Sequence, residues 1–289
     1  MNELSIGISI LLGVIQGLTE FIPVSSTAHV RILPAFLDMQ DVGAAYTAVI
    51  QLGSLIALLF YFRKDLYEFS MQSFLAIRKE IEQYTSLNQT IMNLKHWNYE
   101  AKMPFYLIIG TIPISIFGIL LKNLIKGPFR SLYVVAGSLI LFAILLWISD
   151  VKSKKNKSIE EITLWDAIWI GFAQSLALVP GASRSGVTLM AGLFLNFNRE
   201  SAMRFSFLLS IPAIALSGFY ELFKDWQEIS QLGIMSVFVG IITAIVVSYV
   251  VIAGLLRYLK THNTLVFVIY RIVLGLFIYG LIYKGMISP

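Results

Sequence analysis

Apolar residues form six long uninterrupted runs along this chain, and two further apolar regions are each interrupted by polar residues. The six runs cover about residues 42–62, 104–121, 132–149, 203–222, 233–256 and 265–283. A helix needs roughly 20 apolar residues to cross a bilayer, so each run is long enough to span one. The pattern predicts an all-α polytopic membrane protein with about six transmembrane helices, in a single integral membrane domain over residues 1–289.

The two interrupted regions cover about residues 4–37 and 163–197, and each has its polar residues near the middle. The first contains PVSSTAH at 23–29, and the second contains PGASRSGVT at 180–188. Irregular backbone inside a membrane is tolerated only where it lines a protein-walled or water-filled cavity. We therefore predict two re-entrant helix–loop–helix hairpins whose interruptions face each other, with Pro23 ending the first half-helix of the first hairpin.

The two interrupted regions resemble each other, which suggests an internal duplication. The matched positions are Gly13/Gly171, Gln16/Gln174, Leu18/Leu176 and, after a shift of one residue, Pro23/Pro180. Downstream, TIPISIFG at 111–118 resembles SIPAIALSG at 210–218. We assign repeat 1 to about 1–149 and repeat 2 to about 163–289. If the hairpins enter from opposite sides, the repeats are inverted, and such proteins place a site near the bilayer midplane.

Basic residues are distributed unevenly between the two faces that this topology creates. One face receives fourteen, namely Arg63, Lys64, Arg78, Lys79, Lys95, Lys102, Lys152, Lys154, Lys155, Lys157, Arg199, Arg204, Arg257 and Lys260. The other receives five, namely Lys122, Lys126, Arg130, Lys224 and Lys284. The positive-inside rule makes the first face cytoplasmic and places both termini outside. The polar stretch 63–103 then becomes a cytoplasmic loop, and the spacing of its apolar residues predicts an amphipathic helix on the membrane surface.

Composition narrows the possible functions. Only 13% of the residues are charged, about half the share in a soluble domain, and 57% are hydrophobic. The chain has no cysteine, which excludes disulfides, thiolate catalysis and cysteine metal ligands. The net charge of +5 follows from the loop asymmetry, and no basic surface with interleaved aromatics is evident, so we expect no nucleic-acid partner.

Serines and one arginine at the two interruptions indicate an anion site. Ser25 or Ser26 can cap the helix that follows the first interruption, and Ser183 and Ser185 can do the same at the second. Two helix N-termini directed at one point favour a phosphate. Arg184 adds a planar cation that costs about 2.5–3.5 kcal/mol near the bilayer centre, which favours a functional role. The alternative is a structural arginine that bonds carbonyl oxygens at a helix end.

Glu20 lies four residues after Gln16, so both side chains would share one helix face. A carboxylate beside an anion site can bind a divalent cation that bridges to phosphate, or can act as an acid or base. The alternative is an ion pair with an arginine such as Arg31, Arg184 or Arg271.

His29 follows Ser26 by three residues, so the helix would bring both onto one face. Serine and histidine are the minimal pair for an activated nucleophile, and in this setting we interpret them as catalytic. The alternative is that both are polar groups that line the cavity.

Several other polar residues are weaker candidates. Ser183, Ser185 and Thr188 are candidate phosphate-binding hydroxyls, although such hydroxyls also bond helix carbonyl oxygens. Gln51, in IQLGS, is a candidate for the same cavity. Arg271 is a further intramembrane cation, and the sequence leaves open whether it is structural or forms a second site.

The segments QGLTEFIPVSSTAH, IQLGS and PGASRSGVT together resemble the signature blocks of the undecaprenyl-diphosphate phosphatase family of the bacitracin-resistance type. The resemblance runs along essentially the whole chain. It implies a plasma-membrane hydrolase of a bacterium that converts undecaprenyl diphosphate to the monophosphate and so recycles the lipid carrier of cell-wall synthesis. It also implies an inverted repeat and a metal-dependent site, with Mg²⁺ or Ca²⁺, that opens to the outer face.

The resemblance also implies roles for individual residues. The acidic motif of the family falls on Gln16 and Glu20, its serine and histidine on Ser26 and His29, and its phosphate-binding arginine on Arg184, flanked by Ser183 and Thr188. Many members have Glu where this chain has Gln16, so we expect a weaker metal site or a charge carried by Glu20 alone.

Two other functions fit parts of the pattern. A transporter or flippase for a polyprenyl phosphate would also use inverted repeats and an anion site, but transport needs no Ser–His pair. The phosphatidate-phosphatase type needs a further histidine block, and no histidine follows Arg184 at a suitable distance, which excludes it. The expected partners are the lipid substrate and the bilayer, and the sequence leaves a homodimer open.

Overall fold

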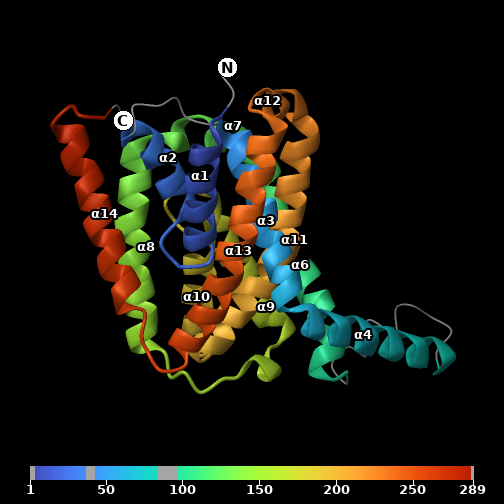
Figure 1. Cartoon of the computed structure of the whole chain (residues 1–289). Helices are drawn as coiled ribbons and strands as arrows, with labels where there is room; N and C mark the ends of the chain where they lie inside the picture. Colours follow the sequence, from blue (N-terminus) through green and yellow to red (C-terminus); the bar gives the residue numbers. More distant parts are fainter. Residues whose placement is uncertain (1–3, 37–42, 84–96, 288–289) are drawn as a thin grey trace.

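The computed structural model describes residues 4–36, 43–83 and 97–287, and these form a bundle of helices joined by short connections (Figure 1). Five helices are long and apolar enough to cross a membrane. They are α6 (Tyr99–Leu120), α8 (Leu132–Lys152), α11 (Arg199–Lys224), α13 (Ile234–Leu259) and α14 (Leu265–Tyr283). Five of the six predicted spans are thus confirmed, and the chain is a multi-pass membrane protein.

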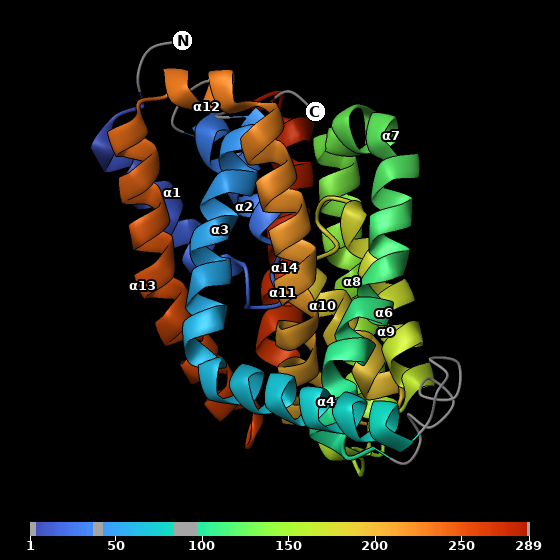
Figure 2. The ribbon, with the colours of Figure 1, turned by 90° about the vertical axis from the view of Figure 1, so that its right-hand side faces the viewer.

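The sixth predicted run forms α3 (Gly43–Tyr61), which continues after a sharp bend into α4 (Arg63–Gln83). The two helices meet at 70°, and α4 extends sideways at one end of the bundle, which we call the α4 end (Figure 2). On α4 the side chains of Tyr67, Phe74 and Ile81 are exposed and recur every seven residues, so they share one face. The predicted polar stretch thus contains a helix, and its position on a membrane surface stays a prediction.

Each interrupted region forms a pair of helices that are too short to cross a membrane. The first hairpin consists of α1 (Ile6–Thr19) and α2 (Ser26–Phe36); the second consists of α9 (Leu164–Ser175), the 3-10 turn η4 (Leu176–Leu178) and α10 (Arg184–Phe194). Figure 1 shows the first hairpin in the upper half of the bundle and α9 and α10 in the lower half. The prediction that Pro23 ends the first half-helix is wrong: α1 ends at Thr19, and turn residues lead into the proline. Proline disfavours the helical region for the residue directly before it, Ile22, and residues 20–22 form turns.

Each hairpin packs against a long helix from the other half of the chain. α1 lies along α13, and α9 lies along α6, while α3 packs on α11 and α8 packs on α14. Glycines allow two of these close approaches. A Cβ on Gly13 would lie 2.6 Å from the Gly240 carbonyl oxygen, and one on Gly171 would collide with the backbone of Gly110.

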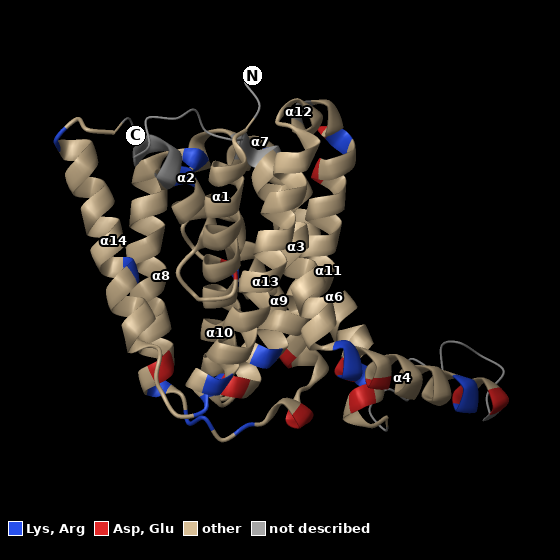
Figure 3. Ribbon diagram, viewed as in Figure 1, with Lys and Arg blue, Asp and Glu red and all other residues tan. Residues whose placement is uncertain are grey.

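Charged residues gather at the α4 end (Figure 3). Asp150 ties three helix ends together there. Its Oδ1 accepts from Arg199 Nε at 2.7 Å, and its Oδ2 accepts from the Thr264 backbone N–H at 2.9 Å and from the Thr264 hydroxyl at 2.8 Å. The opposite end carries the short helices α7 (Lys122–Lys126) and α12 (Trp226–Gln231), with the 3-10 turn η2 (Pro128–Arg130) after α7; the turn η3 (Ile159–Glu161) precedes α9.

Candidate active site

The helices that follow the two interruptions, α2 and α10, begin in the same way. Ser25 and Ser183 immediately precede them, both in the left-handed region, with φ of 73° and 70°. The Ser25 hydroxyl accepts from the Ala28 N–H at 3.4 Å, and the Ser183 hydroxyl accepts from the Gly186 N–H at 3.3 Å. A serine costs energy in this conformation, and such strain concentrates at functional sites. Serine caps are confirmed at both interruptions, with Ser25 and not Ser26 as the cap at the first, and Ser183 and not Ser185 at the second.

The equivalence of the two turns differs from the one that the sequence suggested. Ser25 and Ser183 are separated by the same interval as Gly13 and Gly171. No shift is needed when the serines are matched, whereas matching Pro23 with Pro180 required one. The second resemblance, between 111–118 and 210–218, falls on α6 and α11. α11 directly follows the second hairpin, whereas α3 and α4 stand between the first hairpin and α6.

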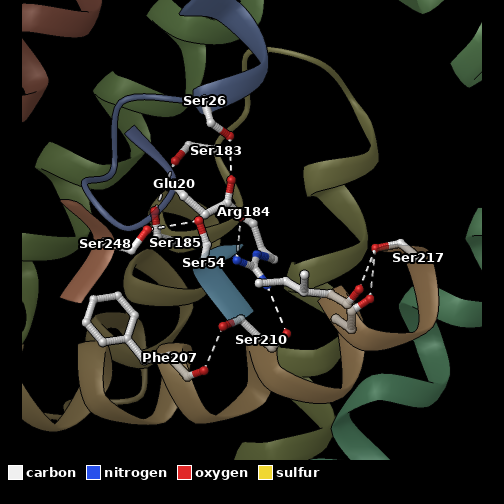
Figure 4. A network of polar contacts seen from close by, with 12 residues as sticks. Glu20, Ser26, Ser54, Ser183, Arg184, Ser185, Phe207, Ser210, Ser217 and Ser248 are labelled. Atoms are coloured by element: carbon white, nitrogen blue, oxygen red, sulfur yellow. Dashed lines mark hydrogen bonds and ion pairs between the residues drawn. The ribbon is translucent and has the colours of Figure 1, made fainter. Parts of the chain in front are cut away.

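An ion pair joins the two hairpins at the centre of the bundle. Arg184 Nη2 lies 2.7 Å from Glu20 Oε1, and the side chains are 14% and 5% exposed (Figure 4). Arg184 Nη1 also donates to the Ser210 carbonyl oxygen on α11 at 3.1 Å. Of the alternatives open for Glu20, the ion pair with Arg184 is the one that the structure forms, and it confirms that the two interruptions face each other.

The second oxygen of Glu20 organises the rest of the first turn. Glu20 Oε2 accepts from Gln16 Nε2 at 2.7 Å and from the Ser26 hydroxyl at 2.7 Å. A carboxylate thus lies within hydrogen-bond reach of a serine hydroxyl, which is the distance that proton abstraction requires. Gln16 is fully buried, and its Oε1 has no hydrogen-bond partner.

A cavity of about 610 Å³ opens beside this network. Its polar lining contains six of the predicted site residues: Glu20, Ser25, Ser26, Gln51, Ser183 and Arg184. Apolar side chains of α6, α11 and η4 form much of the remaining wall, and the cavity extends to Lys122 on α7 and to Tyr220 near the end of α11. A polar base with apolar walls suits a ligand that joins a phosphate to a hydrocarbon chain.

His29 is not part of the cavity lining. Its Nδ1 lies 2.7 Å from the Ser25 carbonyl oxygen and its Nε2 lies 2.6 Å from the Tyr270 hydroxyl, so both ring nitrogens have partners other than Ser26. The Ser26 hydroxyl bonds to Glu20 instead. The expected Ser26–His29 hydrogen bond is therefore absent between these two described residues, because His29 bonds to α14 while Ser26 lines the cavity.

Thr188 and Ser185 make hydrogen bonds within the protein. The Thr188 hydroxyl donates to the Arg184 carbonyl oxygen at 2.8 Å and lies 2.5 Å from the Ser206 hydroxyl. The Ser185 hydroxyl donates to the Ile22 carbonyl oxygen across the interface of the two turns at 3.3 Å. Neither side chain lines the cavity. Both hydroxyls bond carbonyl oxygens of the protein, which was the alternative to phosphate binding.

Arg271 is fully buried and holds the two turns together. Its Nη2 donates to the carbonyl oxygens of Gly181 at 3.0 Å and Ala182 at 2.9 Å, and its Nη1 donates to that of Pro23 at 3.4 Å. Of the two roles left open for Arg271, these bonds support the structural one and not a second site. Sequence reasoning missed its neighbour Tyr270, for which the only signal was its position beside an intramembrane arginine.

Few oxygen ligands for a divalent cation lie near this network. Among the described residues no group of three or more His, Asp or Glu side chains could hold a metal. Glu20 supplies a carboxylate, and the buried Gln16 Oε1 is an oxygen that lacks a hydrogen bond. Mg²⁺ is commonly bound by one or two carboxylates together with phosphate oxygens of the substrate, and here Glu20 would have to exchange its bonds to Arg184, Gln16 and Ser26 for such an ion.

Comparison with known proteins identifies the family of this chain. Residues 9–277 match the family described as bacitracin resistance protein BacA. The chain is 47% identical to an undecaprenyl-diphosphatase of Chlorobium phaeobacteroides and 46% identical to one of Chlorobium luteolum, with 97% of this chain and 98% of each relative covered. It is 43% identical to an undecaprenyl-diphosphatase of Myxococcus xanthus, over 97% of this chain and 90% of that protein. This chain belongs to the bacitracin resistance protein BacA family.

Proposed function

We infer that this protein is an undecaprenyl-diphosphatase, a hydrolase that converts undecaprenyl diphosphate to undecaprenyl phosphate and inorganic phosphate. Relatives that carry this name match it over almost its full length. The observation that carries the inference is the chain of bonds from Ser26 through Glu20 to Arg184 at the wall of a cavity with apolar sides. The product would re-enter cell-wall synthesis as lipid carrier.

We propose that Ser26 is the nucleophile. Its oxygen attacks the terminal phosphorus and its proton passes to Glu20 Oε2, which lies 2.7 Å away. The bond from phosphorus to the bridging oxygen breaks and undecaprenyl phosphate leaves; water then hydrolyses the phosphoserine and releases phosphate. Glu20 takes the role of base that the sequence assigned to His29, because Glu20 is the group bonded to the hydroxyl.

Charge stabilisation in this mechanism falls to Arg184 and to the N-termini of α2 and α10. Most of the catalysis of phosphoryl transfer lies in positioning and in the stabilisation of developing charge on the phosphoryl oxygens. Arg184 begins α10 and lines the cavity, and its guanidinium, which bonds Glu20 and the Ser210 carbonyl oxygen in this structure, would turn to the phosphate when substrate binds. A Mg²⁺ or Ca²⁺ ion held by Glu20 and Gln16 Oε1 would neutralise further charge on the diphosphate.

The serine mechanism is tested by Ser26→Ala, with Ser217→Ala as the matched control in the same cavity. The Ser217 hydroxyl bonds only carbonyl oxygens of its own helix, at 3.0 and 3.3 Å. We expect Ser26→Ala to lose activity by at least about a thousandfold, as removal of a nucleophile does, and Ser217→Ala to retain it. A phosphoserine trapped at Ser26 by rapid acid quench would support the mechanism, and full activity of Ser26→Ala would exclude it.

We also propose that the two halves form inverted repeats whose hairpins enter from opposite sides. The support is the equivalent packing of α1 on α13 and α9 on α6, and the matched left-handed serines that begin α2 and α10. This architecture is also typical of transporters, so a polyprenyl phosphate flippase is the second candidate. Release of phosphate from the lipid in detergent, where there is no second compartment, separates the enzyme from a transporter.

For the orientation, we propose that the α4 end faces the cytoplasm of a bacterium and that the cavity opens to the outer face. The gathering of Lys and Arg at the α4 end supports this orientation (Figure 3). Because the chain lacks cysteine, single cysteines can report it. In intact cells, a membrane-impermeant maleimide should label Lys284→Cys and not Lys154→Cys; the reverse pattern would overturn the orientation.

A further inference from the structure

Tyr270 on α14 forms a hydrogen bond with the histidine of the first hairpin. Its hydroxyl lies 2.6 Å from His29 Nε2, and the two rings are nearly parallel, with an interplanar angle of 7°. The tyrosine is 45% exposed on the outside of the bundle, while His29 is only partly exposed between α2 and α14. Neither side chain is part of the cavity lining, so the pair lies between α2 and α14, outside the cavity.

The partners of His29 fix which nitrogen carries the proton. The Ser25 carbonyl oxygen, 2.7 Å from Nδ1, can only accept, so Nδ1 must donate. In the neutral ring Nε2 is then the acceptor, and the Tyr270 hydroxyl donates to it. The lone pair with which His29 would act as a base is thus already engaged by Tyr270.

The bond from His29 to Ser25 reaches the most constrained point of the first turn. Ser25 has a φ of 73° and directly precedes Ser26, so the direction of its carbonyl and the placement of the Ser26 hydroxyl are linked through one peptide unit. Arg271, the next residue of α14, holds the Pro23 carbonyl oxygen at 3.4 Å. Two consecutive side chains of α14 therefore act on the backbone of this turn.

We propose that Tyr270 is a positioning residue that acts through His29. Its hydroxyl fixes the ring, the Nδ1–H of the ring fixes the Ser25 carbonyl, and this holds the Ser26 hydroxyl against Glu20. His29 then serves as a link in the support of the nucleophile instead of as its base. The inference rests on the proposed role of Ser26.

The first test compares Tyr270→Phe with Tyr279→Phe. Tyr279 is a matched control because it lies on the same helix and its hydroxyl also donates to one partner, the Tyr133 carbonyl oxygen, at 3.1 Å. We expect kcat of Tyr270→Phe to fall about tenfold, which corresponds to about 1.4 kcal/mol, with KM within about twofold, because the groups that line the cavity are unchanged. Tyr279→Phe should match the unmodified enzyme. An unchanged kcat in Tyr270→Phe would overturn the proposal.

The second test separates a supporting histidine from a basic one. The side-chain amide of asparagine can donate from nearly the position of Nδ1 but cannot serve as a base. We expect His29→Asn to keep kcat at least about tenfold above that of His29→Ala, because it restores the bond to the Ser25 carbonyl. Equal loss in both variants would show that the basic nitrogen itself is required, and the proposal would fall.

A spectroscopic test makes the contact observable without turnover. In protein in which His96→Gln and His262→Gln leave His29 as the only histidine, the ¹⁵N spectrum of the ring should show the tautomer protonated at Nδ1. Tyr270→Phe should keep this tautomer, because the Ser25 carbonyl oxygen still fixes the proton on Nδ1, but should move the Nε2 resonance, because that nitrogen loses its hydrogen-bond donor; an unchanged Nε2 resonance would contradict the proposal. If Ser26→Ala keeps full activity while the spectra behave as expected, the error lies in the nucleophile and not in the Tyr270–His29 contact.

Discussion

Glu20 and Arg184 form an ion pair across the two hairpins, and its strength can be measured by a double-mutant cycle. The variants are Glu20→Gln, Arg184→Gln and the combination of both. The charged atoms are 2.7 Å apart, and with an effective dielectric constant of about 20 their attraction is about 6 kcal/mol. Desolvation of two largely buried groups offsets part of this attraction.

Each single variant leaves the other charge without its counter-charge. Removal of one partner of a buried pair costs about 3–5 kcal/mol, and the hydrogen bonds that Arg184 keeps with Ser210 and Glu20 keeps with Gln16 favour the lower end of that range. The combined variant removes both charges together. Its cost should therefore be smaller than the sum of the single costs, by about 2–3 kcal/mol.

The assay is unfolding in mixed micelles of dodecyl maltoside and SDS, which compares the free energies of unfolding of the four proteins. The same cycle on Arg78 and Glu82, an exposed pair at 2.9 Å, is the control, and its coupling should be about 0.3–0.5 kcal/mol. Costs at Glu20 and Arg184 that add within about 0.5 kcal/mol would refute the reasoning. Inorganic phosphate should stabilise Glu20→Gln more than the unmodified protein, because Arg184 is then free to bind it.

Two further substitutions test the metal site and the helix packing. Gln16→Glu places a second carboxylate beside Glu20, so the Mg²⁺ or Ca²⁺ concentration that gives half of full activity should fall about tenfold or more. An unchanged concentration would show that residue 16 does not bind the metal. Gly171→Ala drives a methyl group into the backbone of Gly110 and should cost about 1–3 kcal/mol of unfolding free energy, whereas Gly7→Ala, with open space around it, should not destabilise the protein. Equal effects of the two alanines would mean that α9 and α6 are not packed as described.

Much of the fold could be predicted because its signals are local. Five of the predicted spans are long apolar helices in the structure, and the sixth run forms α3 before the bend into α4. The polar residues at 23–29 and 180–188 indicated that the two apolar regions there are interrupted, and serines do cap the helices that follow. Polar groups are costly inside a membrane, so their presence in an apolar run is informative without any knowledge of the neighbours.

The partners of the site residues were decided only by the tertiary structure. The sequence offered Arg31, Arg184 and Arg271 to Glu20 and paired His29 with Ser26. The fold selected Arg184, 164 residues away, from the three arginines, and joined His29 to Tyr270, 241 residues away, instead of to Ser26. Helical spacing determines which residues share a face, and hydropathy determines which segments enter the membrane. The side chain that each face meets depends on how helices distant in the chain cross, and no local pattern encodes that geometry.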